Sequence, residues 1–91
     1  MPLWVVDIDL SRADHTAFDG YEAQVLALLP RFGGRMERRL RTDDSSREFH
    51  ILHFADDAGF AAFLASPQRA DLHAAGPETG TTATIHRVSE I

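Results

Sequence analysis

The side chains best suited to acid–base chemistry in this sequence are a histidine, His53, and several carboxylates expected beside it. An imidazole titrates near neutrality, so a histidine close to a carboxylate in a partly buried space can act as a general base. Strand alternation predicts that His53 shares one face of a sheet with Asp7, Asp9, Glu37 and Arg39. These residues are the first candidates for a reactive site, with His53 as the base.

The same group of residues also admits a structural interpretation. Asp7, Glu37 and Arg39 could form ion pairs at an interface or in a pocket wall, with His53 packed as a flat ring. Both interpretations stay open at the level of sequence. The residues that a small-molecule ligand would contact on this face are Asp7, Arg39, Phe49, Ile51 and His86.

The remaining histidines do not form a metal site by their spacing. His50 and His53 are three residues apart on one expected strand, so they point to opposite faces and cannot share a metal ion. His86 faces either His50 or the opposite side, depending on the register of the last strand. His15 and His73 fall at expected helix ends and are most simply solvent-facing, although either could line the mouth of a pocket. We therefore expect no bound metal.

Several classes of chemistry have no support in the sequence. There is no cysteine, which excludes disulfides, thiolate nucleophiles and zinc sites with sulfur ligands. The G-x-S-x-G pattern that is typical of serine hydrolases does not occur in the sequence. The pair Gly33-Gly34 follows an expected helix rather than opening one, so it does not resemble a phosphate-binding loop. We expect no nucleotide or other cofactor.

The centre of the chain predicts a β-hairpin, which organises the rest. Residues 35–42 and 47–54 have strand character and flank the polar turn 43–46. Before them, residues 3–10 alternate as a strand, and a helix follows from Ser11 or Asp14 to about Leu29 or Arg31, where Pro30 and the glycine pair end it. The second hairpin strand is apolar on both sides, which favours a central place in the sheet.

After the hairpin the pattern predicts a helix and a last strand. The helix begins at Asp56-Asp57, buries Phe60 and Phe63, and stops at Ser66-Pro67. A further helical turn or two over 67–75, a loop over 76–80 and a strand over 81–88 complete the chain. This βαββαβ order predicts a ferredoxin-like α+β fold, with two helices on one face of a four-stranded antiparallel sheet and the first and third strands central.

Composition and charge limit which kinds of molecule this protein is expected to bind and where it is expected to be found. The chain of 91 residues predicts one domain over 1–91, and its 44% hydrophobic and 25% charged residues are ordinary for a folded protein. A formal charge of −5 argues against nucleic acid and anionic membranes as partners. No apolar run approaches the roughly 20 residues of a membrane span, and the first residues lack a secretion signal, so we expect a cytoplasmic protein.

One face of the expected sheet has no helix to cover it. If both helices lie on the face of Trp4, the opposite face carries Leu3, Val5, Phe49 and Ile51. An apolar patch of this kind predicts an interface. We expect a homodimer formed through the sheet face.

The chain resembles a known family over nearly its whole length. The residues that carry the resemblance run from Leu28 to Arg35, from His50 to Phe54, from Asp56 to Ala65, and over Ser66-Pro67. They resemble small single-domain members of the dimeric α+β-barrel superfamily, which includes antibiotic-biosynthesis-type monooxygenases and many uncharacterised bacterial proteins. The resemblance implies that two sheets meet face to face and close a barrel around a central space, with the helices outside.

Two functions of different class follow as hypotheses. The first is an enzyme that encloses a small apolar or aromatic molecule in the barrel, with cofactor-free monooxygenase-like or isomerase-like chemistry based on His53. The alternative is a non-catalytic ligand-binding or assembly module whose barrel is filled by its own side chains. An interior space of roughly 300 Å³ or more leading to a titratable group would distinguish the enzyme from the filled barrel.

Overall fold

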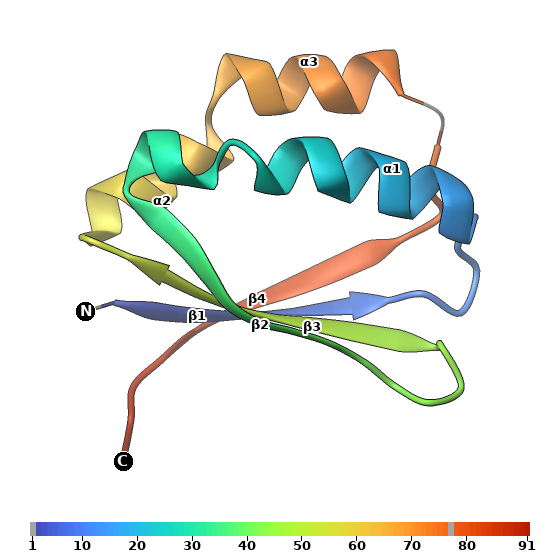
Figure 1. Ribbon diagram of the computed structural model, residues 1–91, viewed down its shortest axis with the longest axis horizontal. Coiled ribbons are helices and arrows are strands. Elements are labelled where there is room, and N and C mark those ends of the chain that lie inside the picture. Colours follow the sequence, from blue (N-terminus) through green and yellow to red (C-terminus); the bar gives the residue numbers. More distant parts are fainter. Residues whose placement is uncertain (1, 77) are drawn as a thin grey trace.

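The fold is a four-stranded antiparallel sheet with its helices on one face (Figure 1). The computed structural model describes residues 2–76 and 78–91 of the protein. Over these residues the strands are β1 (Leu3–Asp9), β2 (Gly34–Arg41), β3 (Arg47–Phe54) and β4 (Thr82–Val88), and the α-helices are α1 (His15–Leu26), α2 (Asp57–Leu64) and α3 (Pro67–Ala75). The sheet order β2-β3-β1-β4 confirms the ferredoxin-like arrangement with the first and third strands central.

The two central strands alternate between a helix-covered face and an open face. Trp4 lies opposite Leu52 and Val6 opposite His50, and these side chains point toward the helices. Strand β4 then pairs with β1 so that Ile85 lies opposite Val6. Each central strand carries apolar side chains on both faces of the sheet, because successive residues of a strand point to opposite faces.

Each α-helix begins at a residue that caps it. The side chain of Asp14 accepts a hydrogen bond from Ala17 N, and Asp56 does the same from Gly59 N. The hydroxyl of Ser66 accepts from Arg69 N and starts α3. This last helix spans Pro67–Ala75, the range that the sequence predicts for it. Helix α3 matters for function because it places Arg69 on the side of the helix layer that faces the sheet.

The first helix is shorter than the sequence predicts. It ends at Leu26, and a 3-10 turn, η1 (Leu29–Phe32), takes the chain to β2. Pro30 has no N–H to donate to a helical carbonyl, so the α-helix cannot continue through it. Gly33 then adopts φ 71°, a left-handed conformation that glycine takes without strain. The helical segment ends at Pro30 and Gly33, as the sequence predicts, but its last turn is a 3-10 turn and the α-helix itself ends about one turn earlier.

Aromatic side chains dominate the core between the sheet and the helices. Trp4 stacks on Phe60 with ring centroids 4.2 Å apart, and Phe54 meets Trp4 edge-on at 5.5 Å. Phe54 is fully buried, and Phe63 lies 5.9 Å from it. These contacts bind α2 to the centre of the sheet, which fixes one wall of the cavity described below.

A β-bulge in β2 changes which face its arginines occupy. Met36 pairs with Leu52, but the next pairs are Arg38 with Ile51 and Arg39 with His50, so Glu37 is an extra residue in the strand. The sequence places Arg39 on the open face with His53, and this facing is wrong. The extra residue turns Arg39 and Arg41 to the helix side, while Arg38 and Leu40 face the opposite way.

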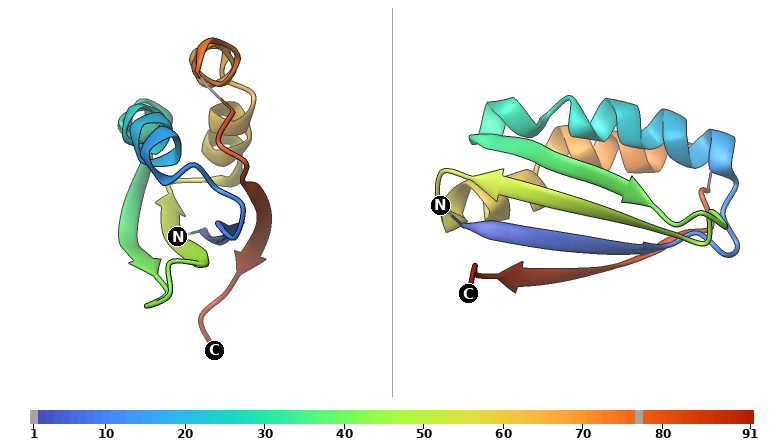
Figure 2. Two further views of the ribbon diagram at one scale, coloured as in Figure 1. Left: turned by 90° about the vertical axis from the view of Figure 1, so that its right-hand side faces the viewer. Right: turned by 60° about the horizontal axis from the view of Figure 1, so that its bottom comes forward.

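The face away from the helices is open in the chain as described (Figure 2). Its register brings together the apolar residues Leu3, Val5, Leu40, Phe49 and Ile51. His86 lies opposite Val5, so the register of β4 places this histidine on the open face. The loop expected over 76–80 includes Pro77, which lies outside the described residues.

None of the helices in the described part of the chain is both long and apolar enough to traverse a lipid bilayer.

Candidate functional site

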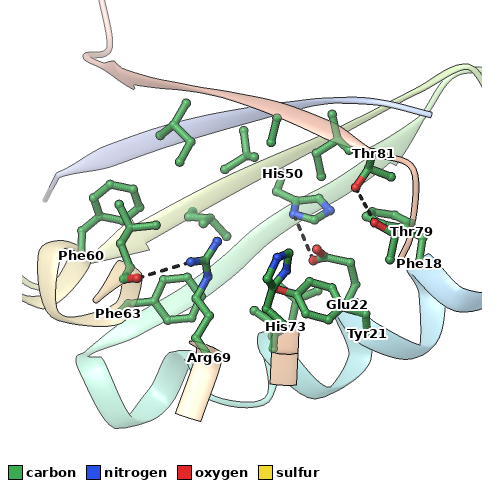
Figure 3. Close-up of a pocket in the computed structure, with 18 residues that line it drawn as sticks. Phe18, Tyr21, Glu22, His50, Phe60, Phe63, Arg69, His73, Thr79 and Thr81 are labelled. Carbon is green, nitrogen blue, oxygen red and sulfur yellow. Dashed lines mark hydrogen bonds and ion pairs between the residues drawn. The ribbon is translucent and has the colours of Figure 1, made fainter. Parts of the chain in front are cut away.

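A cavity of about 240 Å³ lies between the helix layer and the sheet (Figure 3). Its apolar walls come from both layers and include Val6, Ile8, Phe18, Leu52, Phe60 and Phe63. Ligand pockets commonly measure about 300 Å³ or more, whereas a cavity of roughly 150 Å³ is enough to hold benzene. The space therefore suits a small ring system rather than a large polycyclic molecule.

Besides the phenol of Tyr21, four ionisable side chains converge on this apolar space. Glu22 comes from α1, His50 from β3, and Arg69 and His73 from α3. Figure 3 shows Glu22 directed toward His50, with His73 and Tyr21 beside it and Arg69 extending from α3. A mostly apolar cavity with a few convergent polar groups is the usual form of a small-molecule site.

His50 forms a buried pair with Glu48, two residues earlier on β3. The imidazole is 3% exposed, and its Nε2 lies 2.5 Å from Glu48 Oε2. An ionised carboxylate can only accept, so Nε2 carries the proton and donates it to Glu48. The lone pair of a neutral ring is then on Nδ1, which lies 4.0 Å from a carboxylate oxygen of Glu22 in the cavity wall. This arrangement holds one tautomer and aims its basic nitrogen into the site.

Burial keeps His50 in its basic form. It lowers the pKa of His50 by disfavouring the imidazolium, and the bond to Glu48 offsets only part of this effect. The ring is therefore mostly neutral at neutral pH. A neutral imidazole with a fixed tautomer can accept a proton from a molecule in the cavity.

Two arginines hold Glu48 as a charged group despite its burial. Arg39 Nε lies 2.9 Å from one carboxylate oxygen, and Arg41 Nη2 lies 2.6 Å from the other. Both guanidinium groups also reach Asp19 on α1, at 3.5 and 2.7 Å. Burial raises the pKa of Glu48, but hydrogen bonds from His50, Arg39 and Arg41 outweigh it and leave the pKa below the usual range. Glu48 is therefore a fixed anion behind His50.

Glu22 has the opposite character. Burial raises its pKa to about 7, an effect that Arg39 opposes and Glu48 reinforces. A carboxyl group with a pKa near neutrality can hold or release a proton under ordinary conditions. The cavity therefore has two groups, Glu22 and His50, either of which can hold a proton.

The histidine that the sequence favours as a base lies elsewhere. His53 is on the open face, where its Nε2 lies 2.8 Å from Glu37 Oε2. It borders a depression of about 620 Å³ that is open to solvent. Phe49, Ile51, Asp7 and His86 share this face by register.

Two polar atoms of the open face are buried without a hydrogen bond from any described residue. They are Nδ1 of His53 and Oδ1 of Asp7. Arg47 Nε approaches the Asp7 oxygen to 3.7 Å, which is an ion pair but not a hydrogen bond. Such atoms are typical of a face that meets further polar groups.

Sequence reasoning missed Glu22, Glu48 and Arg69 as site residues and treated His50 as a residue of the helix side. A signal for two of them was present. Glu48 and His50 alternate with Leu52 on the apolar face of β3, and a charged residue on such a face is seldom buried without a partner. Within the described residues, no group of three or more His, Cys, Asp or Glu is arranged to hold a metal ion.

Comparison with known proteins finds a likeness of fold only. No family model matches the sequence, and no curated protein matches it. Among solved structures, SnoaB of Streptomyces nogalater, a cofactor-independent oxygenase, has a TM-score of 0.72 at 20% identity, covering 99% of this chain and 93% of its own. Rv0793 of Mycobacterium tuberculosis has a TM-score of 0.64 at 13% identity, covering 100% of this chain and 98% of its own.

A protein of Nitrosomonas europaea assigned as an antibiotic biosynthesis monooxygenase is also similar. Its TM-score is 0.62 at 17% identity, and the match covers 92% of this chain and 95% of the other. These likenesses confirm, at the level of fold, the resemblance that the sequence indicates. They extend over almost the whole length of each protein.

Proposed function

We propose that the protein binds a small apolar or aromatic molecule between its helices and its sheet, and that His50 removes a proton from it. The observation that carries this proposal is the buried Glu48–His50 pair, whose Nδ1 is turned toward the cavity. The proposal places the base in the cavity between helices and sheet, in place of His53 on the open face.

The proposed step is a proton transfer from an O–H or an acidic C–H of the ligand to His50 Nδ1. The imidazolium that forms is stabilised by the anion of Glu48, as in other carboxylate–histidine pairs. Arg39 and Arg41 balance that charge and hold its geometry. Glu22, with its pKa of about 7 and a carboxylate oxygen 4.0 Å from Nδ1, can take up the proton next.

Structural likeness to a cofactor-independent oxygenase supports oxygenation as the reaction class. Removal of a proton leaves an electron-rich anion, and molecular oxygen can add to its carbon. In the balanced reaction the substrate loses two hydrogens and gains one oxygen atom, and the second oxygen atom leaves as water. The proton from His50 or Glu22 completes that water molecule.

A direct test compares the two histidines. We expect His50→Asn to slow deuterium exchange from D₂O into the acidic C–H positions of 2-tetralone by about a hundredfold, because general bases commonly contribute at least that much. Proton NMR measures the exchange, and an oxygen electrode measures uptake with the same ligand.

The matched control is His53→Asn, which changes the same residue type on the open face and should leave exchange unchanged. If His50→Asn exchanged at the wild-type rate, the assignment would fail. Loss of exchange in His53→Asn alone would return the site to the open face.

A second proposal concerns assembly. We infer that the open face pairs with the same face of a second copy, because it combines apolar residues such as Phe49 and Ile51 with the unpaired polar atoms of His53 and Asp7. The interior of the resulting barrel is then a place for side-chain packing, separate from the cavity that holds His50.

A further inference from the structure

Arg69 occupies a different position from the other arginines of the chain. All nine arginines are described, and eight are exposed, whereas Arg69 is half-buried. It lies at the cavity, where its guanidinium carbon is 5.8 Å from the centre of the Phe63 ring. A cation brought into an apolar wall has lost hydration that other groups must replace.

Within the described residues, most N–H donors of Arg69 have no protein acceptor. A guanidinium has five N–H groups, and in this part of the chain Arg69 donates one hydrogen bond, from Nη1 to Leu64 O at 3.3 Å. Among the same described residues, no carboxylate lies within 4.0 Å of it, whereas Arg47 and Arg87 each have one such partner and Arg39 and Arg41 each have two. Figure 3 shows the guanidinium among the residues that line the cavity.

We propose that Arg69 binds an anionic oxygen group of the ligand, so that the substrate class is a small aromatic carboxylic acid. The planar fork of a guanidinium matches a carboxylate in a bidentate manner, and Phe63 and the other apolar walls suit the ring that carries it. The inference rests on the proposed function, because it assigns the substrate of the same cavity. The acid group would lie at Arg69 and the proton to be removed at His50.

The other polar groups of the cavity are compatible with such an orientation. Glu48 is already neutralised by two arginines, so it does not compete for Arg69. Glu22 is the carboxyl group that could repel an anion, and burial raises its pKa to about 7. At pH 6 Glu22 is mostly protonated, while an aromatic carboxylic acid is ionised.

The test uses two probes of nearly equal shape and different charge. We expect 2-naphthoate to bind the wild-type protein about ten- to a hundredfold more tightly than 2-naphthamide at pH 6, measured by isothermal titration calorimetry. Arg69→Gln should remove this preference while leaving the affinity for the amide unchanged. Arg69→Lys, which keeps the charge without the planar fork, should retain part of it.

The control is Arg31→Gln, an exposed arginine on η1 without a carboxylate partner in the described chain, which should keep the full preference. Equal affinity of the two probes for the wild-type protein would overturn the role of Arg69 and leave the proposed function standing. If neither probe bound, the occupancy of the cavity by aromatic molecules would itself be refuted. A preference that survives in Arg69→Gln would assign the anion to another group.

Discussion

At the scale of single residues, Glu22 is the side chain whose ionisation the fold changes most directly. Its side chain is 13% exposed, and burial raises its pKa from 4.5 to about 7. Between these two values the folded protein keeps a proton that the unfolded chain has released. Stability attributable to Glu22 is therefore fully present below pH 4.5 and falls as the pH rises to about 7.

This linkage predicts the behaviour of Glu22→Gln. The variant cannot ionise, so its free energy of unfolding should rise relative to the wild type as the pH increases from 5 to 8, by on the order of 2 kcal/mol. Urea denaturation at several pH values measures the difference. Glu90→Gln, at an exposed carboxylate, should show no such trend. A constant difference between Glu22→Gln and wild type would show that Glu22 titrates normally.

How far the sequence predicts the site depends on the residue. Glu22 lies four residues after Phe18 and three before Val25, on the buried stripe of α1, so its placement could have been read from helix periodicity. The position of Arg69 is less clearly marked, because Leu72 is the one large apolar side chain of α3 and is only partly buried. The distance between His50 and Glu22 depends on packing between elements far apart in sequence.

At the scale of elements, the contact between α2 and η1 leaves no room for a side chain at one position. A Cβ added to Gly59 would lie 2.4 Å from the carbonyl oxygen of Phe32, which is backbone and cannot turn away. We expect Gly59→Ala to lower the free energy of unfolding by about 1–3 kcal/mol, measured by chemical denaturation.

Gly20 supplies the matched control on α1. A Cβ there meets nothing within 4 Å, so Gly20→Ala should raise stability by about 0.4–1 kcal/mol through better helix propensity and a less flexible unfolded chain. If both substitutions were stabilising, the close contact at Gly59 would be relieved by movement of α2.

Strands and helices were predictable because alternation and capping are local signals. β3 and α3 have the bounds expected from the sequence, and Asp14 and Asp56 lie where helix starts are expected. The bulge was not predictable in this way. Residues 35–41 are mostly charged, so neither face offers an apolar pattern that would show the extra residue.

At the scale of the whole molecule, the open sheet face predicts self-association. We expect the wild type to be a dimer at micromolar concentrations and Ile51→Glu to weaken that dimer by at least about a hundredfold, because a charge would enter the centre of the interface. Analytical ultracentrifugation measures the dissociation constant, and circular dichroism checks that the variant is folded.

The control for assembly is Ala61→Glu, an exposed position on α2 on the opposite side of the molecule, which should leave the dimer intact. A wild-type protein that remained monomeric at high concentration would contradict pairing through this face. Proton exchange at His50 would be unaffected by that result, since the cavity is formed within one chain.

The bulge at Glu37 also determines how this chain tolerates insertions and deletions. Removing one residue there would restore regular alternation in β2 and move Arg39 and Arg41 to the open face. The anion of Glu48 would then lose both guanidinium groups, and two cations would enter the surface expected to pair with a second copy. The presence of this one residue therefore determines two properties together, the charge around Glu48 behind His50 and the polarity of the open face. A deletion at this position would change both properties at once.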